Sequence, residues 1–270
     1  MSRCIFCKKN SDNSKSIEHI IPESLGNVEH VLPKGIVCDS CNNYFSIKIE
    51  RTLLDKLYFK NLRHRNFIKT KKGRLVPDKA LLMHPKGGWV EMWIDENGFI
   101  FNHEDHEKIE LIANGECKSL IIPTFPDPEK EDKIVSRFLA KAALESLVYK
   151  YVHAKDWIEE IIEKKELDPI RDYARYGKGD FWEYNQRRIY DEEDRFFDPV
   201  HHPEPYEILH ELDFIHIDGK ILYFILVIMG IEYSINLGGS EIEYYQKWLV
   251  ENNGDSPIRR FSEYMIKRDK

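Results

Sequence analysis

Four cysteines near the N-terminus have the spacing of a metal site. Cys4 and Cys7 form one Cys-x2-Cys pair, and Cys38 and Cys41 form a second pair after thirty intervening residues. Two such pairs can place four thiolates around one tetrahedral Zn²⁺ ion, which closes the site and leaves no position for a substrate. Because a zinc ion held in this way supplies folding energy to a small module, we expect these cysteines to be structural rather than catalytic.

An acid and a histidine lie between the two cysteine pairs and could act with a second ion. Glu18 and His19 fall in a short β-type run; neighbours on a strand normally point to opposite faces, but at a distorted strand end both can address one site. Asn42 directly follows the fourth cysteine, so the zinc would hold its amide at a fixed distance from that strand. A carboxylate and an amide oxygen favour Mg²⁺ or Mn²⁺. We therefore predict Glu18 and Asn42 as ligands of a catalytic ion and His19 as a base.

The elements that must position these residues are a strand, a loop, a second strand and a helix. The first strand is predicted in residues 16–21 and the second at Ile36-Val37, directly before Cys38. Asn42 and Asn43 are predicted to cap the helix, in which apolar residues recur every four positions. These apolar residues are Phe45, Ile49, Leu53 and Leu57.

The rest of the chain has the pattern of a mixed α+β domain. A β-rich stretch is predicted at Trp89–Phe101, a helix from about Asp132 to His153, an antiparallel meander over Leu209–Leu237 and a last helix over Glu241–Asn252. The fifth cysteine, Cys117, stands alone in apolar surroundings and is predicted to be a small buried residue.

Charge is divided unevenly along the chain. The whole sequence carries 40 Lys and Arg against 47 Asp and Glu. Residues 1–74 hold fifteen of the basic and seven of the acidic residues, a net charge of +8, which leaves 25 − 40 = −15 for the remainder. Between Asp55 and Asp78 the sequence has no acid, and its basic residues alternate with aromatic ones, which suits either a phosphate backbone or a solvated surface. The predicted nucleic-acid-binding residues are Lys56, Lys60, Arg63, Arg65, Lys69, Lys71 and Lys72.

Composition is that of a globular protein. Apolar residues make up 42% of the sequence, and no apolar run approaches the roughly eighteen residues of a membrane span. The first residues lack the apolar segment of a secretory signal, so we expect a cytoplasmic protein, in which paired cysteines bind metal more often than they form disulfides.

The combined motif of the first 57 residues resembles that of HNH endonucleases, in the branch with four zinc-binding cysteines that includes the phage four-way-junction resolvases. The resemblance implies a ββα-metal fold in which Glu18 is the metal-binding acid, His19 the general base and Asn42 the second metal ligand. Many members have Asp where Glu18 stands. The family's middle Asn, which orients the base, has two candidate counterparts here, Asn27 and His30. The motif consists of the two cysteine pairs, Glu18-His19-Ile20-Ile21-Pro22 with Gly26, and Asn42-Asn43.

The predicted fold class is therefore α+β, with an N-terminal zinc-stapled ββα-metal module and a mixed α+β domain that contains an antiparallel sheet. The predicted division is a nuclease module at 1–57, a basic connector at 58–78 and a domain at 79–270, to which the sequence assigns no role. A homodimer or a regulatory protein partner could form through that last domain.

The resemblance implies hydrolysis of phosphodiester bonds, with DNA as the expected substrate. His19 would take a proton from water while a divalent ion polarises the scissile phosphate and stabilises the departing 3′ oxygen. Contacts to phosphate carry no sequence information, so little sequence specificity is expected from this module. Nuclease modules joined to a second domain are similar to bacterial antiphage and mobile-element effectors. The alternatives are a non-catalytic zinc-knuckle protein that binds nucleic acid and one that binds a protein partner.

Overall fold

The computed structural model describes residues 2–95, 97–124, 127–198 and 202–258. Helices and antiparallel sheets make up the chain, which confirms the predicted α+β class. It divides into two compact units, which are described separately. Unit 1 is drawn from residues 1–21, 27–53 and 129–270, and unit 2 from residues 22–26 and 54–128.

The N-terminal part of unit 1 has the predicted order of strand, loop, strand and helix. Strand β1 (Glu18–His19) pairs antiparallel with β2 (Val31–Leu32). The predicted second strand at Ile36-Val37 is wrong: these residues lie in a bend. The reason is that the carbonyl of Ile36 accepts a hydrogen bond from the amide of Ile5 at 3.0 Å, so this segment pairs with the first cysteine loop instead of β1.

One helical run follows, built from α1 (Asp39–Phe45), the π-helical segment η2 (Ser46–Glu50) and α2 (Arg51–Leu54). The cap predicted at Asn42 is wrong, because the helix begins at Asp39 with Cys38 as its N-cap residue. With this start Cys38 and Cys41 lie on the same side of the helix, because they are about one turn apart.

The apolar face predicted for this helix is confirmed over most of its length. Phe45, Ile49 and Leu53 are fully buried, while Leu57 is 64% exposed and belongs to the next helix. A spacing of four residues exceeds the 3.6 residues of an α-helical turn, and the wider π-helical turn at η2 accommodates it.

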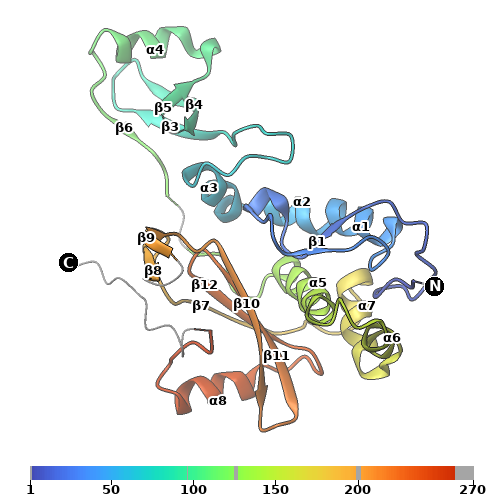
Figure 1. The fold of residues 1–270 in the computed structure, drawn as a ribbon. Helices are drawn as coiled ribbons and strands as arrows, with labels where there is room; N and C mark the ends of the chain where they lie inside the picture. The colour runs from blue at the N-terminus through green and yellow to red at the C-terminus, as the bar shows by residue number, and fades with distance from the viewer. Residues whose placement is uncertain (1, 96, 125–126, 199–201, 259–270) are drawn as a thin grey trace. The chain divides into compact units, whose positions relative to one another are not determined.

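The distal part of unit 1 is a sheet covered by helices. Helix α5 begins after its N-cap Asp132, whose carboxylate accepts hydrogen bonds from two backbone amides, and it packs against β11, β12 and α7 (Figure 1). Three predictions for this part are confirmed: the helix from about Asp132 to His153 is α5, the antiparallel meander is β10, β11 and β12, and the last helix is α8. The four-stranded sheet has the order β10-β11-β12-β7. The elements are α5 (Lys133–Lys150), α6 (Lys155–Glu163), η4 (Lys165–Leu167), α7 (Asp168–Tyr176), β7 (Tyr184–Arg188), β8 (Phe196–Asp198), β9 (His202–Tyr206), β10 (His210–Ile217), β11 (Ile221–Ile228), β12 (Ile231–Asn236) and α8 (Glu243–Glu251).

Every residue of β12 and nearly every residue of β11 is buried, so both faces of these central strands are covered. Helix α8 packs on one face through Tyr245 and Leu249, which meet Tyr223 and Ile225 of β11. Strands covered on both faces read as continuous apolar runs, which is why the sequence marks β11 so clearly.

Unit 2 contains helix α3 and a second four-stranded antiparallel sheet, of order β5-β4-β3-β6. The β-rich stretch predicted at Trp89–Phe101 is confirmed, and it forms β4 and β5, which pair antiparallel. Cys117 is 6% exposed and lies in the core of this unit, as predicted. The elements are η1 (Glu23–Leu25), α3 (Leu57–Arg65), β3 (Asp78–Leu82), β4 (Gly88–Asp95), β5 (Gly98–Phe101), η3 (His103–Asp105), α4 (His106–Ala113) and β6 (Leu120–Ile121).

Two further predictions concern the chain as a whole. In the described part of the chain, no helix combines the length and the apolar character that crossing a membrane requires. The predicted division at residues 57 and 78 stays a proposal about functional modules, because the two units are defined by compactness alone.

Candidate metal and catalytic site

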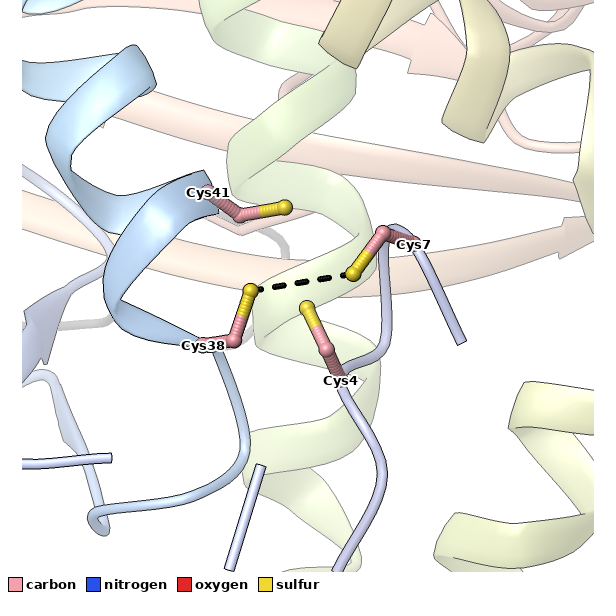
Figure 2. A group of neighbouring side chains, drawn as sticks. All are labelled: Cys4, Cys7, Cys38 and Cys41. Carbon is pink, nitrogen blue, oxygen red and sulfur yellow. Dashed lines mark hydrogen bonds between the residues drawn. The ribbon is translucent and has the colours of Figure 1, made fainter. Parts of the chain in front are cut away.

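The side chains of the four cysteines converge on one point (Figure 2). Cys4 and Cys7 come from the N-terminal loop, and Cys38 and Cys41 from the start of α1. The four sulfur atoms all lie within 4.8 Å of one another, and the sulfurs of Cys7 and Cys38 are 3.6 Å apart. None of the four forms a disulfide. Four convergent sulfurs are the donor set of a closed, tetrahedral zinc site.

The pKa values of these thiols also suit a site that binds a cation. Burial raises the pKa of Cys7 to about 11. The hydrogen bond that Cys4 shares with Cys41 lowers the pKa of Cys4 to about 5 and raises that of Cys41. Without a cation, therefore, Cys4 is the thiol that ionises, because burial and the charge of Cys4 both disfavour the ionised forms of Cys7 and Cys41. A bound Zn²⁺ ion would let all four ionise, so these residues suit zinc.

Two arginines of α7 contact this cysteine cluster from a distant part of the sequence. Arg171 is 2% exposed and its Nε donates a 2.8 Å hydrogen bond to the carbonyl of Ile5, which lies between the first two cysteines. Arg175 donates from Nε to the sulfur of Cys41 at 3.4 Å, and its guanidinium lies 3.7 Å from the centre of the Tyr44 ring. A cation beside a thiolate offsets the negative charge of a four-thiolate zinc site.

We expect Arg175→Ala to loosen the zinc. Removing a hydrogen bond to a ligating group typically costs about 10- to 100-fold in metal affinity, so zinc should pass to a chromogenic chelator faster than from the unmodified protein. Lys178→Ala is the matched control, because Lys178 follows the same helix and is 65% exposed. Equal rates of zinc release from the unmodified protein and Arg175→Ala would contradict this role.

The predicted ion ligands and base lie at the junction of β1 and α1. The Nδ2 atom of Asn42 donates a 3.0 Å hydrogen bond to the carbonyl of Ile17, the residue before Glu18. One turn earlier, a carboxylate oxygen of Asp39 accepts hydrogen bonds from the amide of Ser16 at 2.8 Å and from that of Lys15. These bonds fix the start of α1 against residues 15–17, which lead directly into β1.

The oxygens at this junction fit a divalent ion. Asn42 uses its amide nitrogen to bind the strand, which leaves its oxygen for a ligand. Glu18 is 5% exposed, and within the described residues its buried Oε2 atom has no hydrogen-bond partner. A buried oxygen without a partner is uncommon in a folded protein, and a cation is one group that would satisfy it. A carboxylate and an amide oxygen are hard donors of the kind Mg²⁺ and Mn²⁺ use.

The second oxygen of Glu18 contacts a lysine that is not among the residues predicted for the site. Lys141 of α5 is fully buried, and its Nζ lies 2.8 Å from Oε1 of Glu18 and 3.0 Å from Oε1 of Glu50. Its i+4 neighbour Glu145 lies 2.9 Å away. Glu50, at the end of η2, is only 16% exposed and belongs to this cluster.

Burial and charge oppose each other in this cluster. Burial raises the pKa of Glu18 to about 7, although Lys141 acts in the opposite direction. Burial lowers the pKa of Lys141, but the three carboxyl groups outweigh it and raise that pKa well above its usual range. The ammonium group is therefore charged, and the carboxyl groups compete for it.

The two candidates for orienting His19 shape the loop before β2. Asn27 is 2% exposed; its amide nitrogen donates to the carbonyls of Ile21 and His30, and its oxygen accepts from the amides of Glu29 and His30. The ring of His30 lies edge-on to that of Tyr149, with centroids 6.0 Å apart. The role of either residue toward His19 stays a prediction.

The predicted nucleic-acid-binding residues lie in unit 2, on α3 and the segment after it. Lys69, Lys71 and Lys72 are exposed. Arg63 is 7% exposed and is therefore part of the interior, while Arg65 lies over the ring of Tyr58, with 5.6 Å between the guanidinium carbon and the ring centroid. The remaining two, Lys56 and Lys60, are half-buried.

Comparison with known proteins finds one family. Residues 4–58 match the family model described as HNH endonuclease, which confirms the resemblance predicted for this region. The match contains all four cysteines and the junction of β1 and α1. Searches of curated proteins and of solved structures found no match to the chain.

Proposed function

We propose that this chain is a metal-dependent endonuclease that hydrolyses phosphodiester bonds of nucleic acid, with DNA as the expected substrate. The observation that carries the proposal is the junction of β1 and α1, inside the region matched to HNH endonucleases. There a buried carboxylate oxygen of Glu18 lacks a partner and Asn42 is tied to the strand beside it. A purely structural zinc module needs neither feature.

In this proposal the metal ligands, the general base and the structural cysteines are different residues. Glu18 and Asn42 would hold one Mg²⁺ or Mn²⁺ ion, which when bound polarises the scissile phosphate and stabilises the departing 3′ oxygen. His19, which directly follows Glu18, would take the proton from the attacking water, since imidazole can exchange protons near neutral pH. The cysteine cluster would hold the zinc that keeps the strand and α1 together.

Substrate contacts would come from the exposed lysines of unit 2. Lys69, Lys71 and Lys72 carry positive charge on a segment without acids, and such contacts to phosphate are independent of sequence. We therefore propose little sequence preference and binding that weakens as salt is raised. The finer role as a defence or mobile-element effector stays a prediction, because it follows only from the joining of a nuclease module to a distal domain.

One observation favours the alternative of a non-catalytic zinc protein that binds nucleic acid or a partner. Lys141 already neutralises one oxygen of Glu18 at 2.8 Å. If that ammonium group substitutes for the ion, the module would bind nucleic acid without cutting it. A cleavage assay separates the two functions.

We expect metal-dependent nicking of supercoiled plasmid, or cleavage of single-stranded or four-way-junction DNA. Purified protein is incubated on each substrate with Mg²⁺, with Mn²⁺ and with EDTA. EDTA should abolish cleavage and an excess of Mg²⁺ or Mn²⁺ should restore it, because the ion ligated by Glu18 and Asn42 is exchangeable. Zinc content is measured in every sample to show that the structural ion is retained. No cleavage on any substrate, with zinc bound and nucleic acid still retained in a gel shift, would favour the binding module.

A further inference from the structure

The buried ammonium group of Lys141 touches two parts of the catalytic strand at once. Besides the carboxylate of Glu18, its Nζ reaches the backbone carbonyl of His19 at 2.9 Å. Glu145 of α5 also accepts a hydrogen bond from it, and Glu50 of η2 forms an ion pair with it at 3.0 Å. An ammonium group has three N–H donors and no acceptor, so the four surrounding oxygens outnumber its donors and all three are used.

This lysine comes from outside the region that matches HNH endonucleases. The match ends at residue 58, whereas α5 spans Lys133–Lys150. Glu18, His19 and Glu50 belong to the same unit 1 as α5, which packs against β2 and η2. The catalytic module of this chain is therefore completed by a helix that lies more than seventy residues further along the sequence.

We infer that Lys141 is a positioning residue for the catalytic ion: it holds one carboxylate oxygen of Glu18 and the backbone of His19, and so keeps the other oxygen of Glu18 available to bind the ion. The inference rests on the proposed function and deepens it. The two oxygens of this carboxylate differ, because Oε1 is bound at 2.8 Å while the buried Oε2 lacks a hydrogen-bond partner within the described residues. Without the ammonium group the carboxylate can rotate, and its preformed orientation is lost.

The test measures binding of Mn²⁺ to the zinc-loaded full chain, by electron paramagnetic resonance of the free ion. Glu18→Gln first establishes which part of the binding belongs to this site. Lys141→Met is then expected to raise the Kd for Mn²⁺ at that site by about 10- to 100-fold, the usual effect of losing a group that orients a ligand. Lys141→Arg, which keeps the charge, should recover part of the affinity. Lys150→Met is the matched control, because it lies on the same helix and is 55% exposed.

Lys141→Met leaves three carboxyl groups without a cation and could unfold the module. Lys141→Met combined with Glu145→Gln removes one charge of each sign and leaves Glu18 intact. Zinc content and the unfolding temperature identify which variants fold. A folded double variant that binds Mn²⁺ as tightly as the unmodified protein would overturn the inference, and so would the absence of Glu18-dependent Mn²⁺ binding in the unmodified protein. Cleavage is measured separately: Mn²⁺ binding without cleavage contradicts the proposed function, while the Kd values still decide the role of Lys141.

Discussion

Replacing His19 by alanine is expected to reduce metal-dependent nicking of plasmid DNA by about 10²- to 10⁴-fold, the usual contribution of a general base. The residue follows Glu18 directly on β1 and its backbone carbonyl is held by Lys141. Its side chain is half-buried, so alanine leaves little empty space. The loss should therefore fall on the rate of the chemical step, with zinc content and the unfolding temperature close to those of the unmodified protein.

His153→Ala is the matched control for this experiment. His153 is exposed, lies in the same unit after α5, and has no place in the proposed mechanism. Its removal should leave nicking unchanged. Cleavage by His19→Ala at the rate of the unmodified protein would contradict the assignment of His19 as the general base. Loss of cleavage together with loss of zinc would show instead that the substitution damages the module.

The convergence of the four cysteines and the position of the first strand could be predicted because their information is local. Each Cys-x2-Cys pair places two sulfurs within one turn, and the helix that starts at Asp39 satisfies that spacing directly. Glu18 and His19 are neighbours in sequence, and Asn42 is next to Cys41. Residue types and short spacings were therefore sufficient for these positions. The second strand was misplaced because apolar, β-branched Ile36 and Val37 have the composition of a strand but lie in a bend.

Contacts between residues that are far apart in the sequence could not be predicted. Lys141 and His19 are 122 positions apart, and Arg175 and Cys41 are 134 apart. Within its own helix, Lys141 has the spacing of an ordinary i,i+4 pair with Glu145, which is normally a solvated pair. Its burial follows only from the packing of α5 against β2 and η2. A weak signal did exist: Lys141 stands between Ala140 and Ala142, in an apolar stretch where a lysine is unusual.

Replacing Cys38 by serine is expected to remove the zinc and with it the fold of the N-terminal module. Serine is a poor zinc ligand, so three sulfurs remain, and structural zinc contributes on the order of 10 kcal/mol to folding in small zinc modules. Serine is also a good N-cap residue, and Cys38 is the N-cap of α1 and only half-buried. Neither the start of the helix nor the core should suffer from the exchange itself. Zinc per chain should fall from about one to near zero, and cleavage should be lost.

Cys117→Ser makes the same chemical exchange at the fifth cysteine, in the core of unit 2. It should keep the full zinc content, because its sulfur lies outside the cluster of four. Treating the unmodified protein with a strong zinc chelator should reproduce the unfolding seen in Cys38→Ser, and adding Zn²⁺ should reverse it only in the unmodified chain. If Cys38→Ser retained its zinc and its unfolding temperature, the four cysteines would not form the stabilising site that their geometry indicates, and α7 with Arg171 would have to hold the module together without the ion.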